Sequence, residues 1–282
     1  MASQIKLLTT DNHDRDRVGL KYVYPVVSRR AGGVSIGINL NPNNACNWAC
    51  IYCQVPNLTR GGPPPLDLAL LEAELNQMLD DILHGDFMQI QTSPAARRLV
   101  DIAFSGNGEP TSAPEFPEAV ALVAKLMRAR GLSGLPLRLI TNGSLVYRRS
   151  VKEGLRRLAE VNGEVWFKLD ATEPARILLL NGVHQKTGVA LKRLQLTAGL
   201  APTWVQTCML AVDGQAPSEL QIRDYLSVLS KVRGEIRGVL LYGLARPSMQ
   251  PGADRISALP ENWMEGMGRR VAELGVSVQV SC

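Results

Sequence analysis

Three closely spaced cysteines, Cys46, Cys50 and Cys53, are the residues of this sequence best suited to chemistry. Their spacing is C-x3-C-x2-C, and Tyr52 stands directly before the last of them. Four-iron clusters are normally held by four cysteine thiolates, so three thiolates leave one iron with an open coordination position. Catalytic zinc sites keep one position open in a similar way. The spacing therefore predicts a cluster that can bind a small chelating molecule.

A structural zinc site is the main alternative, with Cys208 or a histidine as the fourth ligand. Structural zinc usually takes its ligands as two pairs, and the sequence holds no second pair. The three histidines, His13, His84 and His184, are isolated. A disulfide is disfavoured, since we find no signal peptide and only five cysteines in 282 residues. A non-enzymatic zinc-binding or RNA-binding protein stays the least favoured interpretation.

The composition is that of an ordinary globular enzyme. The 282 residues are 45% hydrophobic, which suits one α/β domain of barrel size. No apolar run approaches the ~20 residues that span a bilayer. Reduced thiols suit the cytosol, so we expect a cytoplasmic protein with no membrane partner. The net charge of +5, with arginine pairs at 29–30, 97–98, 148–149, 156–157 and 269–270, permits nucleic-acid binding.

Hydrophobic periodicity predicts an alternation of short strands and amphipathic helices. The expected strands are 34–40, 99–104, 137–140, 165–169, 204–212, 239–242 and 276–280. The expected helices are 66–83, 146–158, 187–200, 218–232 and 260–274, with another that stops near Gly131, while 174–180 fits either type. Two capping boxes, Ser112 with Glu115 and Ser218 with Gln221, mark helix starts. This order predicts a parallel sheet with helical crossovers that forms a partial, open barrel.

We expect a single domain over residues 1–282. It would consist of an N-terminal extension at 1–21, a cluster loop at 41–54 and a C-terminal helix and strand at 260–282. The stretch at 61–65, Gly-Gly-Pro-Pro-Pro, is interpreted as a surface excursion of this domain.

Polar residues follow the ends of several predicted strands. In a parallel sheet these ends share one edge, where active sites lie, so we expect one shared site there. In chain order, the residues are Asn39, Asn41, Asn43 and Asn44 with the cysteines, then Ser105-Gly106-Asn107-Gly108-Glu109-Pro110, Thr141-Asn142-Gly143-Ser144, Lys168-Leu169-Asp170, and Gly243 to Ser248.

The cysteine segment resembles the defining motif of the radical SAM superfamily. Gly108-Glu109-Pro110 is similar to that family's Gly-Gly-Glu motif, which binds the amino group of S-adenosylmethionine (SAM), although Asn107 replaces a common glycine or serine. A carboxylate accepts well from an ammonium, and glycine allows close backbone approach. The resemblance implies a partial (β/α)6 TIM-like barrel. It also implies a reduced [4Fe–4S] cluster that cleaves SAM to a 5′-deoxyadenosyl radical, which abstracts hydrogen from a substrate.

The same resemblance implies further cofactor contacts by position alone. Tyr52 matches an aromatic residue whose backbone contacts adenine. Asp170 and Lys168 lie where family members contact the ribose hydroxyls and the SAM carboxylate, and Asn142 lies where a residue often faces the cofactor. The family's chemistry also implies an external one-electron donor of the flavodoxin or ferredoxin type as a partner.

A narrower resemblance is to the wyosine-synthase-like group, over roughly residues 22 to 250. It is carried by the motifs at 24–30, 37–42, 104–111, 141–144 and 168–171. That group includes the enzyme that builds the tricyclic base of phenylalanine tRNA, so a tRNA base or nucleotide is the leading substrate and tRNA a candidate partner. The archaeal tRNA enzymes carry extra cysteines for a second cluster, whereas only Cys208 and Cys282 remain here.

Other substrates stay open. They are a small metabolite, a peptide, or a glycyl-radical protein partner, whose activating enzymes share the cysteine spacing. Arg246 and Ser248 are candidate ligands for an anionic substrate, although a surface salt bridge would equally explain Arg246. The segments before Tyr22, at 55–65 and at 246–258 are candidate covers of the site. Cys208 is expected in the core and Cys282 as a terminal thiol.

Overall fold

The core of the computed structural model is a curled sheet of eight strands within the described residues, which are 7–9, 19–28 and 32–282. Its order is β1-β2-β5-β6-β7-β8-β10-β12. The first pair is antiparallel, and every other neighbouring pair is parallel. The strands are β1 (Val23–Ser28), β2 (Gly33–Ile38), β5 (Leu99–Phe104), β6 (Leu137–Thr141), β7 (Gly163–Lys168), β8 (Thr203–Cys208), β10 (Gly238–Tyr242) and β12 (Val278–Ser281).

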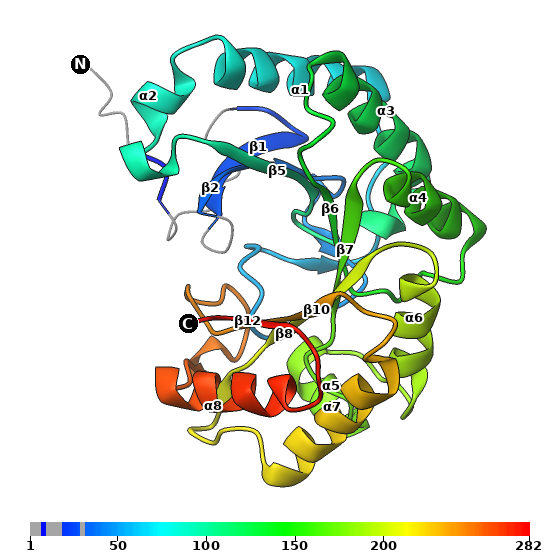
Figure 1. Ribbon diagram of the computed structural model, residues 1–282, viewed down its shortest axis with the longest axis vertical. Coiled ribbons are helices and arrows are strands. Elements are labelled where there is room, and N and C mark those ends of the chain that lie inside the picture. The colour runs from blue at the N-terminus through cyan, green and yellow to red at the C-terminus, as the bar shows by residue number, and fades with distance from the viewer. Residues whose placement is uncertain (1–6, 10–18, 29–31) are drawn as a thin grey trace.

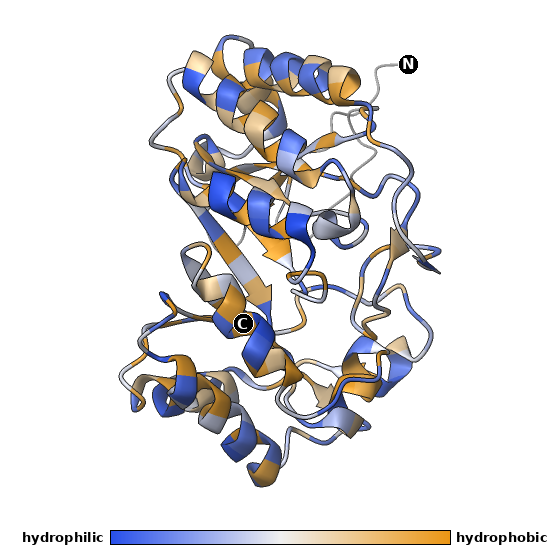
Figure 2. Ribbon diagram, turned by 90° about the vertical axis from the view of Figure 1, so that its right-hand side faces the viewer, coloured by the Kyte–Doolittle hydropathy of each residue, from blue (hydrophilic) through white to orange (hydrophobic). Residues whose placement is uncertain are grey.

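Helices cover the outer, convex face of this sheet, while the concave face encloses the site (Figure 1). They are α1 (Leu68–Leu83), α2 (Phe87–Gln91), α3 (Phe116–Ala129), α4 (Arg149–Ala159), α5 (Pro174–Asn181), α6 (Val189–Ala198), α7 (Glu219–Val232) and α8 (Glu261–Ala272). Their ribbons alternate hydrophobic and hydrophilic residues, as amphipathic helices packed on a sheet do (Figure 2). The fold is therefore the partial barrel that the sequence predicted.

The remaining elements are short. Two small two-stranded sheets pair β3 (Ala45–Cys46) with β4 (Thr59–Arg60) and β9 (Ala211–Val212) with β11 (Ile256–Ser257). Three turns of 3₁₀ helix are η1 (Pro94–Ala96), η2 (Pro110–Ser112) and η3 (Ala253–Arg255). In the described residues no helix is both long enough and apolar enough to span a membrane.

The core lies between the sheet and its helices. Ile36, Ile102 and Leu139 on neighbouring strands are fully buried, as strands covered on a face by helices require. Phe104 at the end of β5 meets Phe116 at the start of α3 edge to face, with ring centroids 5.8 Å apart. This packing fixes the carboxyl end of β5 and so the position of the loop that follows it.

Most predicted elements are confirmed, but the predicted strand 204–212 is divided into β8 and β9, which belong to different sheets. The sequence missed β1, which pairs with β2, and the short helix α2. The capping box of Ser112 with Glu115 is wrong, because Ser112 lies in η2 and its hydroxyl donates to the carbonyl of Glu109 at 2.6 Å. The predicted capping box of Ser218 with Gln221 is confirmed. The ambiguous segment 174–180 is helix α5.

Only a small part of the predicted N-terminal extension is described. Leu8 bridges to Thr92 and is buried against Val27 and Ala96. Thr92 and Ala96 precede β5, at the opposite end of the strands from the cysteines. Residues 1–6 and 10–18 lie outside the described residues.

Candidate active site

Two adjoining cavities open at the carboxyl ends of the strands. The smaller, of about 210 Å³, is lined by all three cysteines and by the loops after β5 and β6. The larger, of about 290 Å³, lies on the concave side of the sheet and adjoins the smaller cavity. The residues common to both are Tyr52, Cys53, Val55, Ser105, Gly106, Ile140 and Lys168. A molecule in the larger cavity would therefore lie beside whatever the cysteines hold.

The end of α5 fixes one side of the cluster loop. The backbone amides of Ala49 and Ile51 donate to the carbonyls of Asn181 and Leu180, at 3.0 and 2.8 Å. Gly182 ends the helix with φ of 64°, and a Cβ there would lie 2.8 Å from the carbonyl oxygen of Ala49. Glycine therefore allows both the left-handed turn and the close approach of the loop.

The segment after β10 fixes the other side. The Ser248 hydroxyl donates to the carbonyl of Ile51 at 2.6 Å and to that of Cys53 at 3.2 Å. The side-chain amide of Gln250 donates to the carbonyl of Val55 at 2.6 Å. Ser248, which the sequence suggested for substrate binding, is thus turned toward the cluster loop.

The three thiols are half-buried and lie on one loop, facing the smaller cavity. Burial raises the pKa of the Cys46 thiol to about 12 and that of Cys50 to about 11. Two N–H groups point at these sulfurs, each 3.4 Å away: the Trp48 amide at Cys46 and the Asn181 side-chain amide at Cys50. Metal binding would displace the thiol protons, and N–H donors suit thiolate ligands.

This donor set fits an iron–sulfur cluster. In the part of the chain that the structure describes, no three His, Cys, Asp or Glu side chains converge on a position for a single metal ion. A cubane takes each thiolate at a different iron, so its ligands need not converge on one point.

The carboxylate of Glu109 organises the loops after β5 and β6. It accepts hydrogen bonds from the Thr111 hydroxyl at 2.6 Å, the Thr141 hydroxyl at 2.5 Å and the Asn142 amide at 2.7 Å. Glu109 is buried, and burial raises its carboxyl pKa despite these bonds. Among the described residues, its hydrogen-bond partners are all neutral, and its side chain lines the smaller cavity. A cationic group in that cavity would thus meet a carboxylate lacking a cationic hydrogen-bond partner.

The other predicted residues of this loop shape the wall of the smaller cavity. A Cβ at Gly108 would lie 2.2 Å from the Ala45 carbonyl oxygen, so only glycine permits this contact with the cluster loop. The Asn107 side chain donates to that of Asn44 at 2.6 Å. Pro110 is buried and begins η2. These contacts join the loop after β5 to the cysteine loop.

Asn142 extends the wall from the neighbouring strand. Its side-chain amide donates to the side chain of Asn47 on the cluster loop at 2.9 Å. Its own side-chain oxygen accepts from the Ser144 amide at 2.9 Å. Asn142 therefore connects the end of β6 to the cluster loop and lines the smaller cavity.

Asp170 is a buried acceptor beneath the cluster loop. It accepts from the Tyr52 hydroxyl, from the Asn181 side chain at 2.9 Å and from the Cys208 amide at 3.0 Å. Cys208 is buried here, as the sequence predicted, and burial raises its thiol pKa. Asp170 thus holds Tyr52 and the end of β8 in fixed positions.

Lys168 lies where the two cavities meet. Its ammonium is 3.3 Å from the Tyr242 hydroxyl and 4.9 Å from the centre of the Tyr52 ring. Burial works against its charge, but the nearby Tyr242 oxygen and Asp170 carboxylate outweigh burial and hold the pKa of Lys168 well above its usual value. It is therefore a half-buried cation that lines both cavities and is available to an anionic ligand in either.

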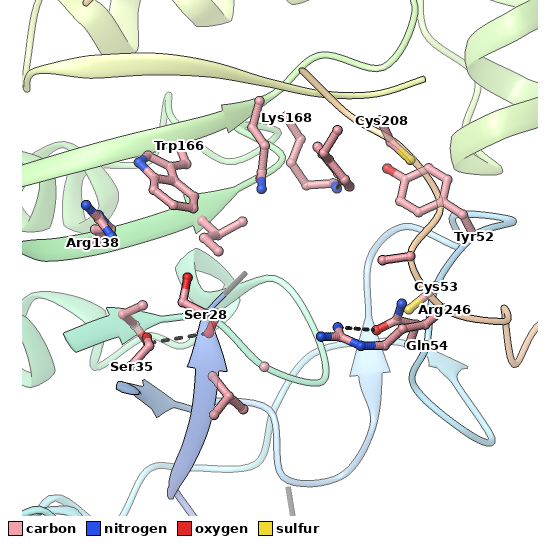
Figure 3. Close-up of a pocket in the computed structure, with 18 of the residues that line it drawn as sticks. Ser28, Ser35, Tyr52, Cys53, Gln54, Arg138, Trp166, Lys168, Cys208 and Arg246 are labelled. Atoms are coloured by element: carbon pink, nitrogen blue, oxygen red, sulfur yellow. Dashed lines mark hydrogen bonds between the residues drawn. The ribbon is translucent and has the colours of Figure 1, made fainter. Parts of the chain in front are cut away.

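Arg246 lines the larger cavity near the cysteines. Its guanidinium donates to the Gln54 side chain at 3.3 Å. Arg246 and Gln54 lie at the same end of the cavity as Cys53, whereas Arg138 and Trp166 lie at the other (Figure 3). Cys282, the last residue, is exposed, in agreement with the sequence.

The deep end of the larger cavity holds a charged group of residues that sequence reasoning missed. Arg138 donates to the carboxylates of Asp101 and Glu164, the latter at 2.6 Å. Its guanidinium also lies over the Trp166 ring, 4.7 Å from the ring centre. Polar residues inside the strands at 99–104, 137–141 and 163–168 were the available signal. They break runs that would otherwise be apolar.

Part of the chain resembles known proteins in sequence. The family model described as the Radical SAM superfamily matches residues 40–194, which include all three cysteines and the loops after β5, β6 and β7. A UPF0026 protein of Helicobacter pylori is 28% identical over 151 residues, 53% of this chain and 42% of that protein. A UPF0026 protein of Methanocaldococcus jannaschii is 26% identical over 162 residues, 57% of this chain and 44% of that protein.

A protein described as GTPase Obg from Brachyspira hyodysenteriae is 28% identical over 151 residues, 53% of this chain but only 19% of its own length. The matched part of this chain thus spans less than half of each of these relatives. Among solved structures, Streptococcus suis SuiB bound to precursor peptide SuiA covers 89% of this chain and 49% of its own, with a TM-score of 0.57 and 14% identity. SuiB bound to S-adenosylmethionine gives a TM-score of 0.54 with 12% identity, over 89% of this chain and 47% of its own. These structures share the fold.

Proposed function

The chain belongs to the radical SAM superfamily, and we propose that Cys46, Cys50 and Cys53 hold its [4Fe–4S] cluster in the smaller cavity. Bound together and reduced, the cluster and SAM supply a radical that removes a hydrogen atom from a substrate. The observation that carries the assignment is that all three thiols face one cavity whose opposite wall is the Glu109 loop. The chain's own part is to hold the thiols, orient SAM and exclude water.

Glu109 is proposed to bind the amino group of SAM. Its partners within the described residues are hydroxyls and backbone amides, and its second carboxylate oxygen accepts from the Asn142 amide. An ammonium would give this buried carboxylate a charge-assisted bond. Gly108 allows the close approach, and Asn107 and Pro110 hold the loop beside it.

Lys168 is proposed to bind the SAM carboxylate, since its half-buried side chain lines the smaller cavity. Asn142 is proposed to face the cofactor, and the Tyr52 backbone to contact adenine. Asp170 remains a candidate contact of the ribose. Because its carboxylate already accepts three hydrogen bonds, we assign it chiefly to holding Tyr52 in place.

The larger cavity is proposed to receive the substrate, with Arg246 as a ligand for an anionic group. Its volume of about 290 Å³ suits a single base, a nucleotide or a small metabolite, so a tRNA would have to insert one base. The wyosine-synthase-like motifs support a tRNA base or nucleotide. The charged deep end around Arg138 favours the second candidate, a free small polar molecule.

A tRNA footprint made of all the arginine pairs finds little support. Arg148 and Arg149 follow β6 and lie at the carboxyl ends of the strands. The pairs at 97–98, 156–157 and 269–270 directly precede strands or end helices, which places them at the opposite end. Arg29 and Arg30 lie outside the described residues.

Anaerobic reconstitution with iron and sulfide tests the cluster assignment. We expect a brown protein with about four irons and four sulfides per chain. Replacing Cys46, Cys50 or Cys53 by Ala should abolish this, while Cys282→Ala, at an exposed thiol, is the matched control. Stoichiometric zinc without sulfide in the anaerobic protein would contradict the assignment.

The SAM assignment is tested by cleavage of SAM to 5′-deoxyadenosine under reduction. Glu109→Ala should weaken SAM binding about tenfold or more, because the ammonium loses a charged acceptor, and should leave the iron content intact. Glu118→Ala, at an exposed glutamate of α3, should bind SAM as the parent does. Equal affinity in the parent and Glu109→Ala would remove the loop from the SAM site.

Substrate class is tested by deoxyadenosine formation with tRNA, free nucleotides or amino acids added separately. A tRNA substrate should raise turnover, and its binding should weaken steeply with salt, because phosphate contacts release counterions. Binding no tighter than to an unrelated polyanion, with no rise in turnover, would shift the assignment to a small metabolite. Arg246→Leu would then be the first variant to examine.

A further inference from the structure

The outer side of the cluster loop carries a basic surface that the proposed cofactor roles leave unused. We call it the basic face and define it by Arg60, Tyr147, Arg148, Lys186, Lys192 and Arg193. Its first half is joined to the cluster loop by hydrogen bonds. Arg60 donates to the Asn47 carbonyl at 2.5 Å and also to the Gly182 carbonyl. The Asn47 side chain donates to the Ser144 hydroxyl at 2.7 Å, three residues before Tyr147.

The second half lies on the α5–α6 connection. Arg193 donates to the Gln185 side chain at 2.6 Å and lines a small hollow with Trp48 of the cluster loop. Tyr147 lies close enough to Arg193 to act electrostatically on it. Lys186 and Lys192 are exposed on either side of the start of α6. Figure 1 shows α4 and α6 along the same side of the molecule.

This surface has a strong positive charge. The three chain segments that supply it, 17–66, 119–152 and 174–212, contain no Asp or Glu. Cations elsewhere in the described chain are often paired, as Arg130 is with Asp80 and Arg255 with Asp213. Helices α4 and α6 both begin at this face without an acidic residue in the first turn, so their positive dipole ends add to the field.

The position of the basic face narrows the choice of partner. Its residues line neither of the two cavities, yet Arg60 donates to the loop that carries the cysteines and Arg193 lines a hollow with Trp48 of that loop. A substrate must enter a cavity to meet the radical, whereas an electron has only to reach the cluster. We propose that the basic face docks an acidic one-electron carrier protein that reduces the cluster, an inference that rests on the proposed function.

Charge complementarity of this kind acts mainly on the rate of encounter. Redox partners form small, transient interfaces, and opposite charges raise their association rates by tenfold or more at low salt. Tyr147 is 56% exposed and offers an aromatic contact for such an interface.

The test uses the reconstituted holoenzyme and a reduced, acidic flavodoxin of known sequence as the probe. Stopped-flow absorbance gives the second-order rate constant of cluster reduction across a salt series. The double variant Arg148→Glu/Lys192→Glu reverses two exposed charges of the basic face. The matched control, Arg233→Glu/Arg237→Glu, makes the same charge change at two exposed residues just before β10, at the opposite end of the strands.

We expect the basic-face variant to be reduced about tenfold more slowly at low salt, with the difference shrinking at high salt, and the control to stay within about twofold of the parent. Reduction by dithionite should be equal in all three proteins, which separates this result from a failure of the cluster assignment. Equal flavodoxin rates in parent and basic-face variant would overturn the proposal. If the basic-face variant with that unchanged rate also bound tRNA more weakly than the parent, the surface would be assigned to RNA.

Discussion

The two ends of β5 each hold a buried carboxylate, and their partners differ. Asp101, near the start of the strand, is held by the Ser35 hydroxyl and by the guanidinium of Arg138. Glu109, just beyond the end, is held by hydroxyls and backbone amides alone in the part of the chain that the structure describes. Burial raises the carboxyl pKa at both ends. The chain therefore supplies a cation to the carboxylate at one end, and we propose that a ligand supplies it at the other.

This difference distinguishes an internal ion-pair group near the start of β5 from the carboxylate that we propose as a ligand-binding group beyond its end. At the deep end, Arg138 bonds to both Asp101 and Glu164, so each of these carboxylates has a cationic partner within the protein. At the cysteine end, the hydrogen bonds of Glu109 hold the loops after β5 and β6 in position. A carboxylate with neutral partners in a buried wall is the arrangement expected where a ligand brings its own ammonium.

The largest effect is expected at the deep end. Arg138→Met leaves the buried carboxylate of Asp101 and the half-buried carboxylate of Glu164 without their cation. It should lower the free energy of unfolding by about 3 kcal/mol, measured by urea denaturation. Arg157→Met removes an exposed partner of Glu153 and should cost about 1 kcal/mol or less. Equal losses in the two variants would mean that the deep-end group is not the internal ion-pair group described here.

The cysteine end should respond to pH. Because the pKa of folded Glu109 lies above its ordinary 4.5, the folded protein binds this proton more tightly than the unfolded chain. The contribution is complete below pH 4.5 and is lost as pH rises through the folded-state pKa. The free energy of unfolding of the parent, relative to Glu109→Gln, should therefore fall as pH rises above 4.5. Urea titrations of both proteins at several pH values measure it, and parallel curves would contradict it.

The smallest effect is expected on the reduction potential of the cluster. Asn181→Leu removes the N–H that points at the Cys50 sulfur, and this donor should stabilise the more negative reduced state. We expect the potential to fall by about 40 mV, which for one electron corresponds to about 1 kcal/mol. Asn76→Leu, at an amide on α1 that donates to the Glu72 carbonyl, is the control. A potential unchanged in Asn181→Leu would limit Asn181 to holding Asp170.

Much of the fold could be predicted from the sequence, because the patterns that indicate strands and helix caps lie within short segments. The span of β5 was predicted without error, and the capping box of Ser218 with Gln221 is present. Ser112 shows the limit of such signals, because its hydroxyl bonds to the carbonyl of Glu109 instead of capping a helix. A short sequence pattern does not reveal which nearby backbone group competes for a side chain.

Asn181 shows a second limit. It ends a segment whose type the sequence left open, and its side chain meets Cys50, which is 131 positions away in the chain. The pairing of Arg138 with Asp101 and Glu164 likewise depends on the register of three neighbouring strands. Such contacts exist only once the sheet has formed.

The sequence by itself determined the chemistry, because cysteine spacing, the Gly-Glu-Pro segment and strand–helix alternation are carried by contiguous residues. Only the tertiary structure decided which groups each of these side chains contacts. It turned Ser248 and Asp170 toward the cluster loop, gave Glu109 neutral partners, and joined three acid-free segments into one surface. The physical reason is that hydrogen bonds and charge fields depend on distance in space, which the curling of the sheet sets and the order of residues does not.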